Sequence, residues 1–198
     1  MSWARKQSTQ KKLNALAKHP ELDLSPADMK DAMEEANAWV YPNLNNGVYR
    51  CGFAKSQGAY DKAIDDLTQA FDKMEAILQK QRYIAGDRFT LADVRLFVTL
   101  VRFDEVYTVY FKTNTRMVMH APAVLNYCRE IYQMPGVAAT VNMNHIKSHY
   151  YCSHPVLNHY SIVPKGADFE ALLQQPHDRD SLGEPASKRP RVEAETTD

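Results

Sequence analysis

The chain has 198 residues, of which 44% are hydrophobic and 24% are charged, so it is long enough to bury one sizeable core. Lysine plus arginine and aspartate plus glutamate both number 24, and this balance argues against nucleic acid or an anionic membrane as the partner. No apolar run has the length of a membrane span, and the opening residues, MSWARKQSTQKK, lack the apolar stretch of a secretory signal. We therefore expect a cytoplasmic protein.

The three cysteines, Cys51, Cys128 and Cys152, are odd in number and lie far apart in the sequence. A disulfide framework usually has an even number of cysteines, and cytosolic thiols stay reduced. We therefore expect free thiols.

The chain opens on a polar and basic segment, residues 1–22, which we expect to be a flexible lead-in. The first helix signal is Ser25 followed by Pro26, because serine is a common N-cap and proline suits the first helical position. Apolar residues then recur at helical spacing as far as Tyr41. We expect this helix to end there, since Pro42 disfavours the α conformation in the residue before it.

The next stretch combines a turn, an apolar hexapeptide and a long amphipathic pattern. Residues 43–47 are Asn-Leu-Asn-Asn-Gly, which is typical of a turn. Residues 48–53 have the look of a strand, but the chain offers no partner strand, so we interpret them as an ordered loop. From residue 56 to residue 81 the pattern predicts an amphipathic helix. Its apolar stripe is Tyr60, Ala63, Ile64, Leu67, Ala70, Phe71, Met74, Ile77 and Leu78.

A helix start is fully specified at Thr90 and Asp93, which form a capping box in its aspartate variant. Phe89 and Val94 stand at the positions of the hydrophobic staple that commonly accompanies such a cap. The residues that follow are too apolar for a surface helix, because they nearly encircle the helix axis. They are Val94, Leu96, Phe97, Val98, Leu100, Val101, Phe103 and Val106.

A further helix is predicted from Pro122, and Pro135-Gly136 interrupts the chain before a short helical piece that precedes His145. Residues 167–198 are rich in charged residues, proline and serine, and we expect a disordered tail. The sequence thus predicts an all-α domain over residues 23–166. We expect roughly five to seven helices around a buried central helix from Thr90 to Tyr110.

A series of short motifs carries a family resemblance. In chain order they are Asn45-Asn46-Gly47-Val48-Tyr49-Arg50-Cys51-Gly52-Phe53-Ala54, Gln57 with Ala59-Tyr60-Asp61, Asp93 with Arg95-Leu96-Phe97, Arg102-Phe103-Asp104 with Val106-Tyr107, Phe111-Lys112, Tyr132-Gln133 with Pro135-Gly136-Val137, and His145-Ile146-Lys147 with His149-Tyr150-Tyr151 and Ser153-His154. This order resembles the C-terminal half of Xi-class glutathione transferases, also called glutathionyl-hydroquinone reductases. The resemblance implies the glutathione-transferase C-terminal helical bundle.

The resemblance also predicts what the chain lacks. The family carries its glutathione site and a catalytic Cys-Pro cysteine in an N-terminal thioredoxin-like domain. One βαβ unit needs about 30 residues, and fewer precede Ser25. No cysteine here is followed by proline. We therefore expect the helical domain alone, with no catalytic residue of its own and with glutathione as a co-substrate that this chain does not hold by itself.

The resemblance assigns the hydroquinone pocket to phenols of the helical domain, at Tyr49, Tyr107 and Tyr150. A phenol hydroxyl can donate to and accept from a quinol oxygen, and its ring offers a stacking face. The opposing interpretation is that each phenol packs in the core and bonds a carbonyl group. The sequence does not separate Tyr150 from Tyr151.

Charged and metal-binding side chains are interpreted as structural. His145, His149, Cys152, His154 and His159 match no closed zinc pattern, so no metal site is predicted. Asp93 is assigned to the helix cap, and Asp104 is expected to pair with a nearby arginine because a buried charge needs a partner. The basic run 188–191, Lys-Arg-Pro-Arg, is interpreted as a solvated charge run rather than a nuclear import signal.

Two functions remain open from the sequence. One is a glutathione-dependent reductase that removes glutathione from glutathionyl-hydroquinones, with an aromatic hydroquinone-type substrate. The other is a binding or dimerisation module, or a truncated product, that keeps only the helical fold. Without the thioredoxin-like half one apolar face is expected to be bare, so we expect a homodimer or an aggregation-prone monomer.

Overall fold

The computed structural model describes residue 19 and residues 22–182, and every regular element in that part of the chain is helical. The α-helices are α2 (Lys30–Val40), α3 (Gly47–Gly52), α4 (Gln57–Leu78), α5 (Leu91–Arg102), α6 (Thr108–Tyr110), α7 (Pro122–Tyr132), α8 (Met143–Ser153) and α9 (Phe169–Leu173). Short 3-10 or π turns are η1 (Ala27–Met29), η2 (Tyr41–Asn45), η3 (Phe103–Tyr107), η4 (Val118–His120), η5 (Ala138–Thr140) and η6 (Arg179–Ser181). The predicted all-α fold is confirmed.

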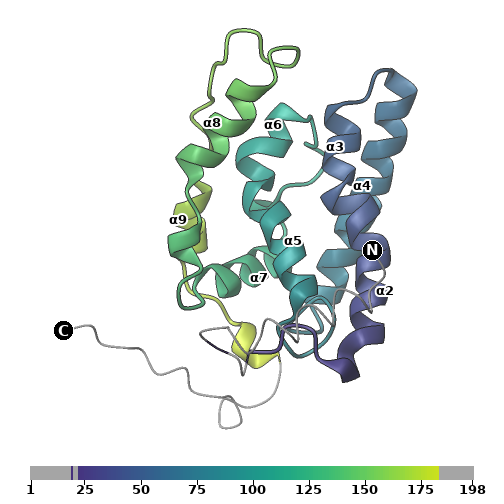
Figure 1. Cartoon of the computed structure of the whole chain (residues 1–198), viewed down its shortest axis with the longest axis vertical. Coiled ribbons are helices and arrows are strands. Elements are labelled where there is room, and N and C mark those ends of the chain that lie inside the picture. The colour runs from purple at the N-terminus through teal and green to yellow at the C-terminus, as the bar shows by residue number, and fades with distance from the viewer. Residues whose placement is uncertain (1–18, 20–21, 183–198) are drawn as a thin grey trace, which may run out of the picture.

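The central helix of the bundle is α5, continued by η3 and α6. Helices α2, α3 and α4 lie on one side of it, and α7, α8 and α9 lie on the other (Figure 1). Leu96, Leu100, Phe103 and Val106 of the central segment are completely buried. The predicted central helix is thus confirmed, except that Val98 is 46% exposed and belongs to an open face.

The capping box at the start of α5 is present as predicted. The Thr90 N–H donates to Asp93 Oδ2 at 2.8 Å, and the Ala92 N–H donates to Thr90 Oγ1 at 3.3 Å. Both side chains are fully buried. A second donor, the Ile84 N–H, reaches Asp93 Oδ1 at 2.9 Å, so the same carboxylate also fixes the loop before the helix.

The first helix begins differently from the prediction, and although α2 ends at Val40, next to the predicted end, a π turn follows it directly. Ser25 makes no side-chain cap; its N–H donates to Asp23 Oδ1 at 2.9 Å, and Pro26 precedes the short turn η1. After α2, Pro42 does not end the helical conformation of the backbone, because the wider π turn η2 accommodates the proline ring. The Asn46 N–H donates to the Tyr41 carbonyl oxygen at 2.8 Å across this turn. The helical path therefore continues.

Residues 47–52 form helix α3, so the predicted ordered loop is wrong. The physical reason is tertiary packing, which overrides a local pattern with strand-like composition. Val48 and Cys51 are buried, and a side chain at Gly47 would lie 3.6 Å from Leu67 of α4. By contrast, the predicted helix over residues 56–81 is confirmed as α4, with Ser56 as its N-cap.

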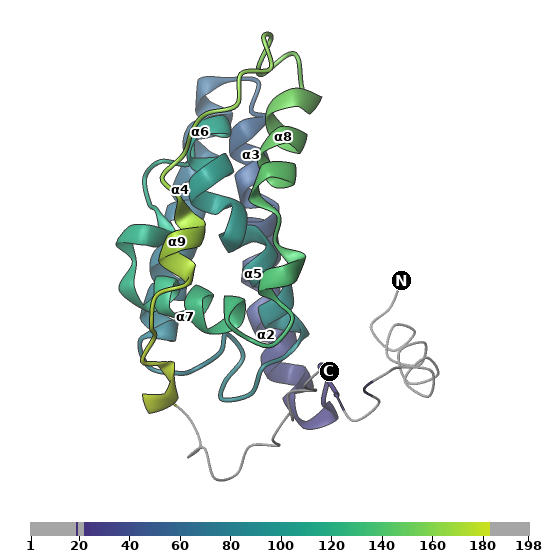
Figure 2. The same ribbon diagram turned by 90° about the vertical axis from the view of Figure 1, so that its left-hand side faces the viewer.

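The C-terminal segment differs most from the prediction. Residues 167–182, assigned to a disordered tail, form α9 and η6 along the edge of α7 (Figure 2). Phe169 and Leu173 are buried in the core. The buried Glu105 accepts hydrogen bonds from the N–H groups of Ala167 and Phe169 at 3.1 and 3.0 Å, which fixes the start of α9. Residues 183–198, with the basic run 188–191, and residues 1–18 and 20–21 of the lead-in lie outside the described part.

A search of the described helices for one with the length and apolarity of a membrane span finds none.

Candidate functional site

Three phenols meet at the end of the bundle formed by α3, η3 and α8. The hydroxyl groups of Tyr49 and Tyr150 are 2.6 Å apart, and those of Tyr150 and Tyr107 are 2.8 Å apart. These residues are 101 and 43 positions apart in the sequence, so only the fold brings them together. Every phenol that the sequence predicted for the site therefore belongs to one hydrogen-bonded group, here called the phenol row.

The phenol row runs from the interior to the surface. Tyr107 and Tyr150 are buried, whereas Tyr49 is 38% exposed. Three hydroxyl groups carry three protons, and two bonds within the row use only two of them. When Tyr107 donates to Tyr150 and Tyr150 donates to Tyr49, the O–H of Tyr49 remains to donate to a bound molecule.

The row stays protonated at neutral pH. Burial, and after it the hydrogen bond with Tyr150, raises the pKa of Tyr107 far above its usual range. Burial also raises the pKa of Tyr150 to about 12. The phenols therefore act as neutral hydrogen-bond donors and acceptors, and they are poor candidates for general bases at physiological pH.

One fully buried ring, Phe111, packs against all three phenols and restricts their positions. Its centroid lies 5.5 Å from that of Tyr107 in a nearly parallel stack, 5.3 Å from that of Tyr49 and 6.0 Å from that of Tyr150. Such ring pairs restrict both position and tilt. Phe111 was not predicted as a site residue from the sequence.

The close approach of Phe111 to α3 requires a glycine at position 52. A Cβ atom there would lie 2.1 Å from Phe111 Cδ1. We predict that Gly52→Ala lowers the free energy of unfolding by about 1–3 kcal/mol, because the ring must shift in a filled core. Gly58→Ala is the matched control, since no heavy atom lies within 4 Å of a Cβ there. Urea unfolding followed by circular dichroism measures both; equal stability of the two variants would contradict the tight packing.

The structure separates Tyr150 from Tyr151. The Tyr151 hydroxyl donates to the backbone oxygen of Glu105 at 3.3 Å, and its ring packs 4.7 Å from that of Tyr110. Neighbouring residues of a helix point in different directions, so only Tyr150 reaches the phenol row. Tyr151 has the structural role that the opposing interpretation gave to any single phenol.

The two buried thiols are unsuited to nucleophilic attack. Cys51, Cys128 and Cys152 are all free, as predicted. Burial raises the pKa of Cys51 to about 11 and also raises that of Cys128. Cys152 is exposed, and its Sγ lies 3.8 Å from Ser161 O. A nucleophilic cysteine needs a lowered pKa and access to substrate, and neither buried thiol has them.

Two histidines of the segment 145–159 make contacts with Tyr150. His154 Nδ1 lies 3.3 Å from the Tyr150 carbonyl oxygen, so this nitrogen donates, and the His149 ring packs against Tyr150. Among residues 19 and 22–182, no group of three or more histidine, cysteine or acidic side chains has metal-binding geometry.

The predicted ion pair of Asp104 with an arginine is wrong. Its two carboxylate oxygens accept hydrogen bonds from the N–H groups of Val118 and Met119, both at 2.8 Å. These N–H groups belong to the first residues of η4, where a helical turn leaves its N–H groups without partners in the turn. The carboxylate thus ties η4 to the central helix by the same chemistry as a helix cap.

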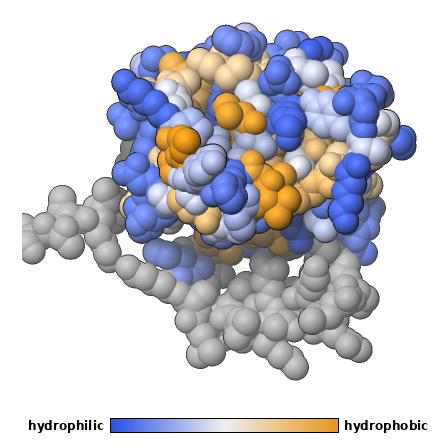
Figure 3. Space-filling view, turned by 90° about the horizontal axis from the view of Figure 1, so that it is seen from above, coloured by the Kyte–Doolittle hydropathy of each residue, from blue (hydrophilic) through white to orange (hydrophobic). Residues whose placement is uncertain are grey.

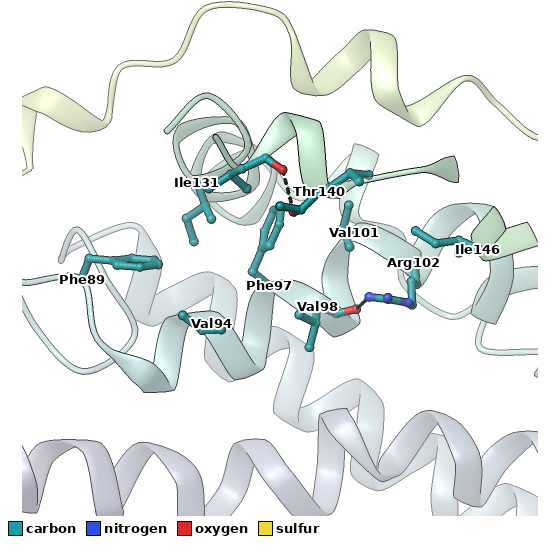
Figure 4. A pocket seen from close by; sticks show the side chains of 11 residues that line it. Phe89, Val94, Phe97, Val98, Val101, Arg102, Ile131, Thr140 and Ile146 are labelled. Atoms are coloured by element: carbon teal, nitrogen blue, oxygen red, sulfur yellow. Dashed lines mark hydrogen bonds between the residues drawn. The ribbon is translucent and has the colours of Figure 1, made fainter. Parts of the chain in front are cut away.

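A second feature is an apolar groove of about 210 Å³ beside α5. Its walls come from α5, α7, η5 and α8, and the exposed Val98 stands on its rim (Figure 4). The bare apolar face expected from the sequence, and the self-association that it would favour, stay predictions. The groove is lined by Phe89, Val94, Phe97, Val98, Val101, Arg102, Ile131, Val137, Thr140, Val141 and Ile146.

Comparison with known proteins identifies the class of this fold. The family profile of the glutathione S-transferase C-terminal domain matches residues 57–130. This range holds all of α4, the capping box and the central helix, and it ends near the end of α7. Residues 57–130 are therefore a C-terminal helical domain of the glutathione S-transferase type.

Its relatives define the branch of the family. The glutathionyl-hydroquinone reductases YqjG of Escherichia coli and PcpF of Sphingobium chlorophenolicum are 42% and 44% identical, over 80% and 73% of this chain and 48% and 46% of theirs. The Xi-class transferase from Natrialba magadii superposes with a TM-score of 0.78 at 42% identity, over 81% of this chain and 49% of the other. The glutathione-bound structure of YqjG gives 0.79 at 41% identity, over 85% and 54%. The chain thus spans about half the length of these relatives.

Proposed function

We propose that this chain holds the hydroquinone in the glutathione-dependent reduction of glutathionyl-hydroquinones. The observation that carries the proposal is the phenol row, which ends at the exposed Tyr49. A quinol oxygen both donates and accepts hydrogen bonds, as each hydroxyl of the row does. The two curated relatives that bear this activity in their names support the same substrate class.

The reaction needs a thiolate that attacks the sulfur of the glutathione conjugate. The bond between that sulfur and the ring carbon breaks, the ring carbon takes up a proton, and a second thiolate reduces the disulfide that forms. Neither buried thiol of this chain suits the attack, since burial raises the pKa values of Cys51 and Cys128. In our proposal the thiolate comes from a thioredoxin-like domain outside this sequence.

Glutathione fits the phenol row poorly. It carries two carboxylates, which proteins commonly bind with arginine, lysine or helix N-termini. The hydroxyl groups of Tyr49, Tyr107 and Tyr150 bond to one another, and the nearby Arg102 cation acts on Tyr150 through its charge. The row suits a neutral aromatic diol, so we propose that it binds the quinol portion of the conjugate and leaves the peptide portion to the thioredoxin-like domain.

Binding of hydroquinone to the purified chain, measured by ligand-detected NMR with oxygen excluded, tests the proposal. We predict saturable binding that weakens about 3- to 10-fold in Tyr150→Phe, because losing the middle hydroxyl breaks both hydrogen bonds of the row. Tyr160→Phe removes the same atom from an exposed side chain outside the row, and it should leave binding unchanged. Absence of binding, or equal loss in both variants, would contradict the proposal.

A further inference from the structure

Two exposed aromatic rings stand side by side next to the outer end of the phenol row. Phe53 is 45% exposed and Tyr49 is 38% exposed, although large apolar rings are usually covered. Their planes differ by 5° and their centroids are 6.5 Å apart. At this end of the molecule hydrophobic surface lies open among hydrophilic residues (Figure 3). The pair therefore presents apolar ring surface beside a hydroxyl group that has a proton to donate.

The backbone sets the spacing of this pair. The Phe53 N–H donates to the Tyr49 carbonyl oxygen at 2.9 Å, so the two residues are one helical turn apart on the same face of α3. Phe53 is the last residue of that turn, immediately after Gly52, whose missing side chain admits the Phe111 ring. Both exposed rings thus project from a rigid helix end.

Neighbouring rings hold Phe53 in position. Its centroid lies 5.3 Å from that of the fully buried Phe111 and 5.4 Å from that of His154, which meets it edge-on. His154 is itself held by its Nδ1 contact with the Tyr150 backbone. An exposed ring fixed on two sides loses little conformational freedom when a ligand packs against it, which favours binding.

We infer that Phe53 is the residue that selects a planar aromatic ring at this site, with the Tyr49 hydroxyl taking the ring's oxygen. This inference rests on the proposed function and adds a specificity determinant to it. Stacking on a ring rewards a flat aromatic molecule, whereas the hydroxyl row by itself would accept any diol. The interpretation against it is that Phe53 only covers Phe111, in which case any apolar side chain would serve equally well.

The test compares two probes, hydroquinone and cyclohexane-1,4-diol, which carry the same hydroxyl groups on a flat and a puckered ring. Dissociation constants are measured by ligand-detected NMR on the full chain. We expect Phe53→Ala to weaken hydroquinone binding about 5- to 10-fold and to leave the weak binding of cyclohexane-1,4-diol unchanged. Phe53→Tyr should keep the preference for hydroquinone, and Phe53→Leu, which covers Phe111 without a flat ring, should lose it.

Tyr41→Ala is the control, since it removes another exposed aromatic side chain and should change neither constant. Circular dichroism establishes that each variant is folded. If the parent chain binds no hydroquinone, the proposed function and this inference both fail. If the parent binds hydroquinone and either Phe53→Ala or Phe53→Leu keeps the parental preference, the inference alone is overturned and the proposed function stands.

Discussion

Replacing Arg179 by methionine is expected to lower the free energy of unfolding by about 3–5 kcal/mol, the range for breaking a buried charge network. The Arg179 side chain is almost completely buried, although it comes from the C-terminal segment that composition assigns to a tail. Its guanidinium donates to the carbonyl oxygens of Leu78, Gln81 and Arg82, of which the Gln81 bond measures 2.8 Å. The Leu78 carbonyl group ends α4, where a helix has no intrahelical donors left, and the carbonyl groups of Gln81 and Arg82 lie in the connection that follows.

The loss in Arg179→Met has an electrostatic part as well. Glu130 lies 3.9 Å from the Arg179 guanidinium, pairs closely with Arg82, and accepts a hydrogen bond from the Tyr83 hydroxyl at 2.8 Å. Methionine fills similar volume but supplies neither the donors nor the charge, so the carbonyl groups and part of the carboxylate stay buried without compensation. The connection between α4 and α5 should loosen first.

Arg88→Met is the matched control for this measurement. Arg88 pairs with Asp28, but their side chains are 50% and 69% exposed. A surface ion pair of this kind contributes at most about 1 kcal/mol. Urea unfolding followed by circular dichroism gives both free energies. If Arg179→Met were no more destabilising than Arg88→Met, the contacts of Arg179 would not contribute to the stability of the folded domain.

Local signals in the sequence predicted the helices well. The capping box of Thr90 and Asp93 and the stripe of α4 depend on residues three to four positions apart, so the sequence displays them directly. The prediction of an ordered loop over residues 48–53 was wrong because the conformation there depends on α4, against which α3 packs, and on the π turn that carries the chain past Pro42.

The tail prediction failed for a similar reason. Its composition is polar, and low hydrophobicity usually predicts disorder. Two long-range contacts order the segment nevertheless. The Glu105 carboxylate accepts hydrogen bonds from the backbone at residues 167–169, and the Arg179 guanidinium donates to the carbonyl group at the end of α4. These partners are 62 to 101 positions apart, and no periodicity connects them. At Gly166, just before this segment, any Cβ would collide with the Glu105 carboxylate, so the close approach of the chain requires glycine there.

The site was predicted in part. Family resemblance selected Tyr49, Tyr107 and Tyr150, and the structure brings their hydroxyl groups together. Neither Phe53 nor Phe111 was named as a site residue from the sequence, since a phenylalanine has no polar atom that would distinguish it from a core residue. Their significance comes from exposure at one position and from complete burial beneath the phenols at the other. Such information exists only in three dimensions.

Replacing Asp93 by alanine is the second change with a large expected effect, a loss of more than about 3 kcal/mol in the free energy of unfolding. The fully buried carboxylate accepts four hydrogen bonds, from the Thr90 N–H, the Thr90 hydroxyl, the Ile84 N–H and the Tyr127 hydroxyl, at 2.8 to 3.0 Å. Alanine would leave all four donors buried without an acceptor. The loss should therefore exceed that of an ordinary N-cap substitution, which is about 1 kcal/mol.

Asp93→Asn separates the shape of the cap from its accepting capacity. Asparagine keeps the size and one acceptor oxygen, but its NH₂ group would face donors, so at least one buried donor loses its partner. We expect a loss between those of alanine and the parent, near 2 kcal/mol in order of magnitude. Asp65→Ala, an exposed acidic residue on α4, is the control and should change stability by less than about 0.5 kcal/mol. Equal losses for alanine and asparagine would show that charge on the carboxylate, rather than the number of its acceptors, stabilises the start of the central helix.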